Sequence, residues 1–152
     1  MRNIIQYPND ILSQKAKSIT EINSTINSII EDMKFYLLKD TSVGLAAPQL
    51  GESIRFIGVK YGIDILFLIN PEIIKFSDKT YPSLEGCLSI DRGQSQFMVK
   101  RYKIVKVRAL NLQSQLVTYK ARDLFGRVLQ HEIDHLNGIL INNQIAPSKA
   151  SS

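Results

Sequence analysis

The clearest indication of a chemical role in this sequence is a pair of histidines four residues apart with a glutamate between them. The segment His131-Glu132-Ile133-Asp134-His135 contains H-E-x-x-H and holds both histidines of the 152-residue chain. On a helix, residues i and i+4 lie on one face, about 5–6 Å apart at Cβ, so two imidazoles placed there can bind one divalent metal ion. Glu132 would then reach a water on that metal. The pattern predicts a metal-binding helix.

The third metal ligand must come from earlier in the chain. A catalytic metal site usually has three protein ligands and one position open to water. No Asp, Glu, His or Cys follows His135, and the sequence contains no third histidine. A carboxylate or the single cysteine, Cys87, therefore completes the set. Because a thiolate binds soft and borderline metals strongly, the combination of Cys87, His131 and His135 is favoured.

The composition predicts one globular domain spanning residues 1–152, with a frayed tail at about 146–152. Hydrophobic residues make up 44% and charged residues 22%, as in an ordinary globular protein. No apolar run approaches the roughly 20 residues of a membrane span, and no signal-peptide core is present, so no membrane partner is expected. One cysteine excludes an internal disulfide and fits a reducing cytosol.

The net charge of +5 and the pI of about 9.4 are mildly basic. Part of this charge lies in the segment from Lys100 to Arg108, where a basic strand could favour a polyanion such as RNA. No nucleic-acid-binding motif accompanies it, so no specific DNA binding is expected.

The metal helix needs other elements to hold it. Its own span is predicted as about Arg122–Asn137, with Gly138 just beyond its end. A first helix is predicted over Thr20–Lys39 from isoleucines, methionine and leucine at helical spacing, with Thr20 or Ser24 as its cap. This apolar stripe indicates a core-facing helix.

Strands are predicted between the two helices. Residues 53–60 and 64–69 form a hairpin in this prediction, which Asn70-Pro71 ends. Residues 98–111 alternate between apolar and basic side chains, which indicates a strand or a bent strand pair, and 116–121 form another strand. The small-residue stretch 40–51 interrupts regular structure. It indicates either a backbone that approaches a ligand closely or a tight, buried connection.

Three segments together resemble a known family. Ser-Val-Gly-Leu-Ala-Ala-Pro-Gln (42–49), Glu-Gly-Cys-Leu-Ser (85–89) and Gln-His-Glu-Ile-Asp-His-Leu-Asn-Gly (130–138) are similar, in order and spacing, to the three motifs of the peptide deformylases. The resemblance runs over nearly the whole chain. It implies an α+β fold in which mostly antiparallel sheets wrap around the central metal-binding helix, with the first helix packed outside.

The same resemblance implies the activity and its setting. Family members remove the formyl group from the N-terminal formylmethionine of nascent polypeptides and release formate. The implied cofactor is one divalent metal ion, usually Fe²⁺, which Zn²⁺, Ni²⁺ or Co²⁺ can replace. The implied partners are N-formylmethionyl nascent peptides and the ribosome. The implied location is a bacterial cytoplasm, or that of the bacterial host if the gene is viral.

Carried over residue by residue, the resemblance assigns the chemistry. Cys87, His131 and His135 match the metal ligands, and Glu132 matches the general base and acid. The side-chain amide of Gln49 and the backbone N–H of Leu88 match the groups that stabilise the oxyanion.

Four further residues match substrate contacts. The backbones of Val43 and Gly44 match positions that pair with the extended peptide, as in strand addition. Val43, Leu124 and Val128 are candidates for the methionine pocket, because Leu124 and Val128 share a helix face with His131.

Glu85 and Asp134 are candidates for groups that orient a metal ligand or pair with Arg101. A structural salt bridge accounts for either of them equally well.

The sequence departs from the family pattern at a few positions. Ser42 stands where the first motif opens with glycine, and Gly126 replaces a usual alanine in the metal helix. The C-terminal helix that many bacterial members use at the ribosome is lacking, so ribosome docking is expected to use the basic strand around Lys100–Arg108 instead.

Two other functions remain as alternatives at this stage. A minimal zinc peptidase would cleave internal peptide bonds and would tolerate loss of Cys87. A degenerate ribosome-associated binding protein would keep the metal only for structure, although intact Gln49, Cys87 and Glu132 argue against such decay.

Overall fold

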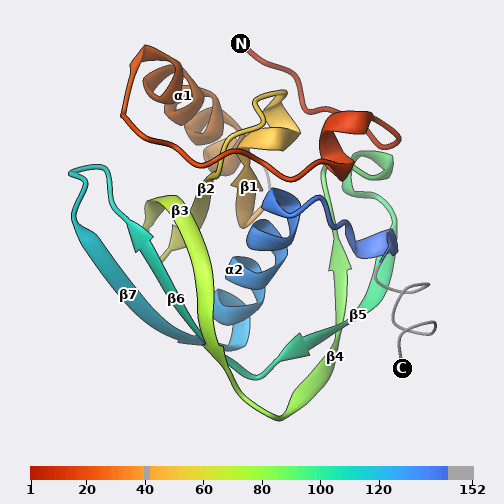
Figure 1. The fold of residues 1–152 in the computed structure, drawn as a ribbon. Coiled ribbons are helices and arrows are strands. Elements are labelled where there is room, and N and C mark those ends of the chain that lie inside the picture. Colours follow the sequence, from red (N-terminus) through yellow and green to blue (C-terminus); the bar gives the residue numbers. More distant parts are fainter. Residues whose placement is uncertain (40–41, 144–152) are drawn as a thin grey trace.

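A helix at the centre of the molecule, α2 (Asp123–Leu136), lies between two antiparallel sheets (Figure 1). In this computed structural model, which describes residues 1–39 and 42–143, one sheet has the strand order β1-β2-β3-β6-β7 and the other pairs β4 with β5. The predicted α+β class, with antiparallel sheets around the metal helix, is confirmed. The expected tail at 146–152 lies outside the described residues.

The elements follow one another along the chain in a simple order. They are η1 (Asp10–Ser13), α1 (Ser24–Lys39), β1 (Gly44–Ala46), η2 (Ala47–Leu50), β2 (Phe56–Tyr61), β3 (Asp64–Phe76), β4 (Thr80–Gly86), η3 (Asp91–Gly93), β5 (Gln96–Tyr102), β6 (Ile104–Leu110), β7 (Leu116–Arg122) and α2. Within the described ranges, no helix is both long and apolar enough to cross a membrane.

The inner face of the larger sheet supports α2. Strand β6 alternates buried Val105 and Val107 with exposed Lys106, so one of its faces is apolar. Leu129 and Ile133 of α2 are buried in the same cluster as these valines. Burying each such side chain contributes about 1.5–3 kcal/mol, and this packing sets the rotation of α2 about its axis. The opposite face of the helix is thereby turned towards the smaller sheet.

Helix α1 packs on the outside of the larger sheet, as expected, but it starts later than predicted. The Asn23 side chain accepts hydrogen bonds from the backbone N–H groups of Thr25 and Ile26, at 3.1 and 3.3 Å. The predicted start at Thr20 and the predicted caps are therefore wrong, because asparagine satisfies the free N–H groups of the first turn here. Met33 and Leu37 then join a core cluster with residues of β2 and β3.

Strand β3 passes through the point where the sequence predicted its end. Asn70 has φ 50°, and the pairing with β6 shifts register between Ile69 and Glu72. The Asn70 side chain accepts from the Ile19 N–H at 2.8 Å and donates to the Ile19 carbonyl at 2.9 Å. Pro71, which has no N–H to give the ladder, is accommodated at this bulge rather than ending the strand.

The basic segment 98–111 is a bent strand pair whose halves belong to different sheets. Strand β5 pairs with β4, whereas β6 pairs with β3 and β7, and the chain turns between them at Lys103. Strand β4, which the sequence analysis did not predict, carries the second motif up to Gly86. The bend brings that motif over the histidine face of α2.

Candidate metal centre and active site

Helix α2 carries three of the predicted functional side chains on one face. The rings of His131 and His135 have their centroids 5.1 Å apart, and His135 is buried. Glu132 lies beside them and is 4% exposed. The helix ends at Leu136, and Gly138, two residues beyond it, has φ 73° and forms the left-handed turn that glycine tolerates best.

Cys87, directly after β4, completes a cluster of metal-binding atoms. Its Sγ lies 3.4 Å from Nε2 of His135, and one ligand atom from each of Cys87, His131 and His135 lies within 4.8 Å of the others. Bonds of about 2.0–2.3 Å to a tetrahedral ion place neighbouring N and S ligands about 3.4–3.6 Å apart. The Cys87–His135 pair has this separation, and the predicted donor set as a whole is close enough to hold one metal ion such as iron or zinc.

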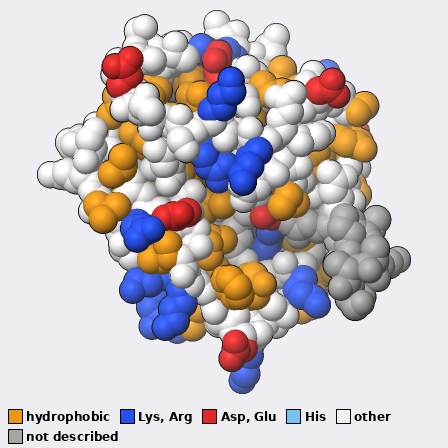
Figure 2. All heavy atoms as spheres, viewed as in Figure 1, with side chains coloured by type: hydrophobic (Ala, Val, Ile, Leu, Met, Phe, Trp, Pro, Cys, Tyr) orange, Lys and Arg blue, Asp and Glu red, His pale blue; other side chains and the backbone are white. Residues whose placement is uncertain are grey.

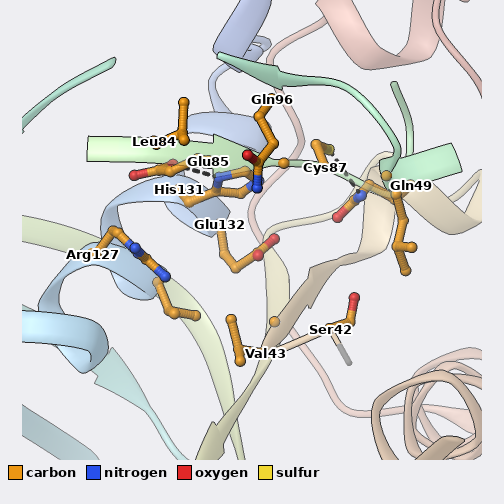
Figure 3. A pocket seen from close by; sticks show the side chains of 15 residues that line it. Ser42, Val43, Gln49, Leu84, Glu85, Cys87, Gln96, Arg127, His131 and Glu132 are labelled. Atoms are coloured by element: carbon orange, nitrogen blue, oxygen red, sulfur yellow. Dashed lines mark hydrogen bonds and ion pairs between the residues drawn. The ribbon is translucent and has the colours of Figure 1, made fainter. Parts of the chain in front are cut away.

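Charged side chains behind His131 fix the orientation of its ring. Nδ1 of His131 lies 2.9 Å from Oε1 of Glu85, which leaves Nε2 for the metal (Figure 3). Glu85 also accepts two hydrogen bonds from Arg101, at 2.9 and 2.7 Å, and Arg101 donates a third, at 2.7 Å, to Asp134. Glu85 therefore does both of the things expected of these two candidates, because it orients His131 and pairs with Arg101. Asp134 pairs with Arg101.

The electrostatics of this cluster favour a bound cation. Burial works against the charge of Glu85, but the hydrogen bonds from Arg101 and His131 outweigh it and lower the pKa of Glu85 to about 2. Burial likewise opposes a charge on His131, yet Glu132, Cys87 and Glu85 raise its pKa to about 10. The negative groups that stabilise a positive charge on His131 would also attract a divalent metal ion.

Glu132 projects into the same space without a fixed partner. Burial raises the pKa of Glu132 to about 7, against the opposing charge of His131. Its Oε1 has no hydrogen-bond partner among the described residues. Gly44 of β1 makes room for it, because a Cβ at that position would lie 2.7 Å from Oε2 of Glu132. A buried carboxyl group with a free oxygen and a pKa near neutrality suits proton transfer.

Gln49 is held in one orientation beside the cysteine. Its Oε1 accepts from the backbone N–H of Ala46 at 2.9 Å, so its amide nitrogen must point the other way. That Nε2 donates to Oγ of Ser89 at 3.1 Å and lies 3.6 Å from Sγ of Cys87. Figure 3 shows the amide of Gln49 and the thiol of Cys87 on one side of Glu132 and the ring of His131 on the other.

These groups surround an open cavity of about 310 Å³. Its lining includes most of the predicted site residues, namely Val43, Gly44, Gln49, Cys87, Leu88, Val128, His131 and Glu132. His135 lies beneath the cavity wall, where it is 1% exposed. Leu124 is not among the lining residues. It is 52% exposed at the start of α2 and lines a neighbouring cavity, because Arg127 lies between the two spaces and contributes to both.

Arg127 and Gln96 line the cavity although the sequence analysis did not select them. Arg127 lies four residues before His131, so the helical spacing that linked the histidines could have identified it. Gln96 begins β5 and reaches the cavity only through the pairing of β5 with β4, which no local pattern indicates.

Known proteins are similar to this chain in sequence and in fold. The family model for polypeptide deformylase matches residues 1–151. Peptide deformylase 1 of Clostridium acetobutylicum is 37% identical to the chain over 99% of both sequences. The crystal structure of peptide deformylase from Thermotoga maritima superposes with a TM-score of 0.88 at 35% identity, covering 95% of this chain and 97% of that one. A Met-Ala-Ser-bound structure of the enzyme from Acinetobacter baumannii gives a TM-score of 0.87 at 30% identity, covering 95% and 98%.

Proposed function

Because this chain belongs to the polypeptide deformylase family, we propose specific roles for its own residues in the removal of a formyl group from an N-terminal methionine. The chain is a metal-dependent hydrolase of this family, and its substrates are N-formylmethionyl nascent peptides. The observation that carries the residue roles is that Cys87, His131, Glu132 and Gln49 line one cavity, with His135 directly beneath its wall beside Cys87.

Cys87, His131 and His135 are the proposed metal ligands. When bound there, a divalent cation would supply a Lewis acid that polarises the formyl carbonyl and lowers the pKa of the attacking water. Fe²⁺ is the proposed resident ion, and Zn²⁺, Ni²⁺ or Co²⁺ could replace it, since one thiolate and two imidazoles accept all of these borderline metals. Support comes from the ligand-atom separation and from Glu85, which holds Nδ1 of His131.

Glu132 is the proposed general base and acid. It takes a proton from the attacking water as the water oxygen bonds to the formyl carbon. It then gives that proton to the methionine nitrogen as the C–N bond breaks, which releases formate and a free amino terminus. Its buried position and its Oε1, which lacks a hydrogen-bond partner among the described residues, support this role.

Gln49 and Leu88 are the proposed oxyanion donors. The hydrogen bond from Ala46 to Oε1 aims the Nε2 of Gln49 at the side of the cavity that holds Cys87. Leu88 directly follows Cys87 in the chain. In the N-terminal arm, Nε2 of Gln6 donates to the Leu88 carbonyl oxygen at 2.8 Å and holds this backbone in place. Donors fixed in advance stabilise developing negative charge most effectively.

The peptide is proposed to add as a strand beside β1, at Val43 and Gly44. Strand β1 is an edge strand and pairs with β2 alone in the described sheet. The Val43 carbonyl accepts from the Lys60 N–H at 2.8 Å, so the alternation of a strand directs the backbone groups of Gly44 away from β2. Val43 and Val128, which line the cavity, are the proposed contacts of the methionine side chain. Leu124 remains a candidate that lines only the adjoining space.

We further propose that residues 1–152 form one catalytic domain that works at the ribosome in a bacterial cytoplasm, because its substrates are nascent chains. The predicted docking strand around Lys100–Arg108 needs revision. Arg101 is 3% exposed and bound to Glu85 and Asp134, so it is not available at the surface.

Formate release from formyl-Met-Ala-Ser tests the activity directly. The purified protein loaded with Fe²⁺ should release one formate for each free amino terminus formed. Cleavage of an internal peptide bond instead would indicate a peptidase. If formate release is absent with Fe²⁺, Ni²⁺ and Co²⁺ while metal is bound stoichiometrically, the proposed function fails.

Cys87→Ala tests the ligand set. The variant should bind metal much more weakly, because two imidazoles alone leave the site one strong donor short. Metal content after dialysis, measured beside the wild type, provides the readout. Metal retained at full affinity would refute the assignment of Cys87.

A further inference from the structure

Arg127 is a positive charge on the wall of the proposed active-site cavity that no step of the proposed reaction uses. It lines the cavity that holds Glu132 and also the neighbouring cavity at Leu124. Its side chain is half-buried, and no acceptor among the described residues forms a hydrogen bond or ion pair with it. A guanidinium group that keeps its donors free beside a cavity is suited to the carboxylate of a ligand.

Strand β1 gives the direction in which a bound peptide leaves the metal centre. At one end of β1, the N–H of Ala46 binds the side chain of Gln49, the proposed oxyanion donor beside the metal ligands. Two residues earlier, a Cβ on Gly44 would lie 2.8 Å from Cγ1 of Val128, which precedes both histidine ligands on α2. A peptide beside β1 with its formyl group at the metal centre therefore extends past Gly44 towards Ser42 and the beginning of α2.

The spacing of an extended peptide brings its third side chain to Arg127. Side chains of a strand alternate between two sides and advance by about 3.4 Å per residue, so the third lies on the side of the first, about 7 Å further on. The first side chain, that of methionine, has Val128 as a proposed contact. One turn of a helix spans about 5.4 Å, so the surface of α2 reached next is that of Leu124 and Arg127.

The surroundings of this position carry an excess of positive charge. Among the described residues, the cavity at Leu124 is lined by three cations, Lys103, Arg122 and Arg127, and by one acidic residue, Asp123. Such an excess favours an acidic side chain at this place and disfavours a basic one. Leu124 is 52% exposed, so it can also cover the aliphatic part of a glutamate.

We propose that Arg127 makes this chain selective for N-formylmethionyl peptides with aspartate or glutamate as their third residue. The guanidinium binds the carboxylate through two parallel N–H···O bonds, a geometry that arginine can form and lysine cannot. Arg127 is a specificity-determining residue, because it contacts the peptide beyond the methionine and takes no part in proton transfer. The proposal rests on the proposed deformylase function and adds a substrate preference to it.

Formate release from paired peptides tests the proposal. Formyl-Met-Ala-Glu-Ser-amide and formyl-Met-Ala-Gln-Ser-amide differ by one charge, and their amide ends remove the terminal carboxylate that Arg127 could otherwise bind. The wild type loaded with Fe²⁺ or Ni²⁺ should show a kcat/KM about five-fold higher for the glutamate peptide, mainly through a lower KM, as for an ion pair at a partly exposed site. This preference should decline as KCl rises from about 50 to about 500 mM. Equal values for the two peptides would overturn the proposal.

Variants at Arg127 assign the preference to this side chain. In Arg127→Gln the two peptides should react equally. Arg127→Lys should keep part of the preference, because the charge remains while the paired hydrogen bonds are lost. Any change in the chemical step cancels in the ratio, since both peptides carry the same formylmethionine. A wild-type preference that persists in Arg127→Gln would refute the role of this residue.

A matched variant removes one positive charge elsewhere. Lys and Arg side chains gather at the lower left of the molecule in Figure 2, where β6 and β7 run in Figure 1. Lys106 of β6 is exposed and lines neither of the two cavities, so Lys106→Gln lowers the net charge as much as Arg127→Gln does. This control should keep the wild-type ratio. Equal loss of the preference in both variants would mean that overall charge governs it, and the proposal would be wrong.

Two further measurements separate a subsite at the third residue from a general attraction of anions. Formyl-Met-Glu-Ala-Ser-amide should have no advantage over its glutamine counterpart, because a second side chain points to the opposite side. An equal advantage there would contradict the proposal. Calorimetric titration with the products Met-Ala-Glu-Ser-amide and Met-Ala-Gln-Ser-amide should show the same preference without turnover. If no peptide releases formate, the proposed function fails, whereas equal release from all of them refutes only the selection by Arg127.

Discussion

Glu132 and Glu85 are two buried carboxyl groups whose surroundings shift their pKa values in opposite directions. Arg101 and His131 hold Glu85 in its charged form, so its pKa falls to about 2. Glu132 has no such cation bonded to it, and burial raises its pKa to about 7. The residue with a fixed partner can orient a ligand, and the residue without one can exchange a proton.

Glu132→Ala should abolish turnover but keep the metal. Removing a group that transfers protons costs about 10²–10⁴-fold in rate, while the three ligands remain in place. Formate release and metal content measured on the same sample provide the check. Loss of both together would mean that Glu132 holds the metal rather than moves a proton.

Glu85→Gln should lower the free energy of unfolding of the metal-free protein at neutral pH. A carboxyl group whose pKa falls from 4.5 to about 2 on folding stabilises the fold fully above pH 4.5, by about 3 kcal/mol, and loses this contribution as the pH falls towards 2. The free energy of unfolding in urea should therefore differ between wild type and variant at neutral pH, and the difference should shrink in acid.

The exposed ion pair between Glu31 and Lys34 offers a control for this measurement. Glu31→Gln should cost less than about 1 kcal/mol, as is usual for surface pairs. A difference between wild type and Glu85→Gln that stays constant from neutral to acid pH would contradict the stabilising role of the Glu85 charge.

At the scale of single elements, α2 is positioned by a close approach to the strand that precedes it. A Cβ on Gly126 would lie 2.9 Å from the carbonyl oxygen of Ala121, at the end of β7. The sequence marks Gly126 as a departure that costs about 1 kcal/mol of helix propensity. In this fold the glycine also gives the chain room to turn from β7 directly into α2.

Gly126→Ala should therefore destabilise the protein, although alanine is the better helix former. The contact is with backbone atoms, which cannot rotate away as a side chain can. We expect the melting temperature to fall, and activity at low temperature to fall with it if α2 shifts. A rise in melting temperature would show that β7 and α2 adjust freely and that propensity dominates.

At the scale of the whole molecule, the N-terminal arm ties the first and second motifs together. The Ile5 N–H donates to the Gln49 carbonyl at 2.7 Å, and the Tyr7 N–H donates to the Ser89 carbonyl at 2.6 Å. Between them, Gln6 donates to the Leu88 carbonyl at 2.8 Å and accepts from the Arg92 N–H at 3.2 Å. The arm thus fixes the backbone that carries the proposed oxyanion donors.

Gln6→Ala should lower kcat several-fold and leave metal content and KM nearly unchanged. Gln6 is a positioning residue, because it acts on the Leu88 backbone and not on the substrate. Oxyanion donors act mainly in the transition state, so a small displacement of Leu88 affects kcat first. Gln6→Glu, which keeps an acceptor for Arg92 but loses the donor to Leu88, should resemble Gln6→Ala. A variant changed only in melting temperature would indicate a purely structural role.

The sequence alone determined the chemistry of this protein to a large extent. Spacing on one helix put His131 and His135 on a common face, and because no donor follows His135, the predicted third ligand, Cys87, lies earlier in the chain. Helical spacing is a local property, so it survives whatever the rest of the fold does. The three motifs indicated the family, the resemblance to that family implied the α+β class, and the matching family model and structures confirm both the family and the class.

Only the tertiary structure decided how the rest is arranged. The sequence predicts that a strand ends at Asn70-Pro71, but hydrogen bonds between the Asn70 side chain and the Ile19 backbone hold this point as a bulge within the strand. The sequence predicts that Arg101 belongs to a basic surface strand, yet the bend at Lys103 buries it against Glu85. Lys75, Lys106 and Lys120 lie far apart along the chain and come side by side only through strand register. Register and burial depend on partners distant in sequence, and no local pattern contains them.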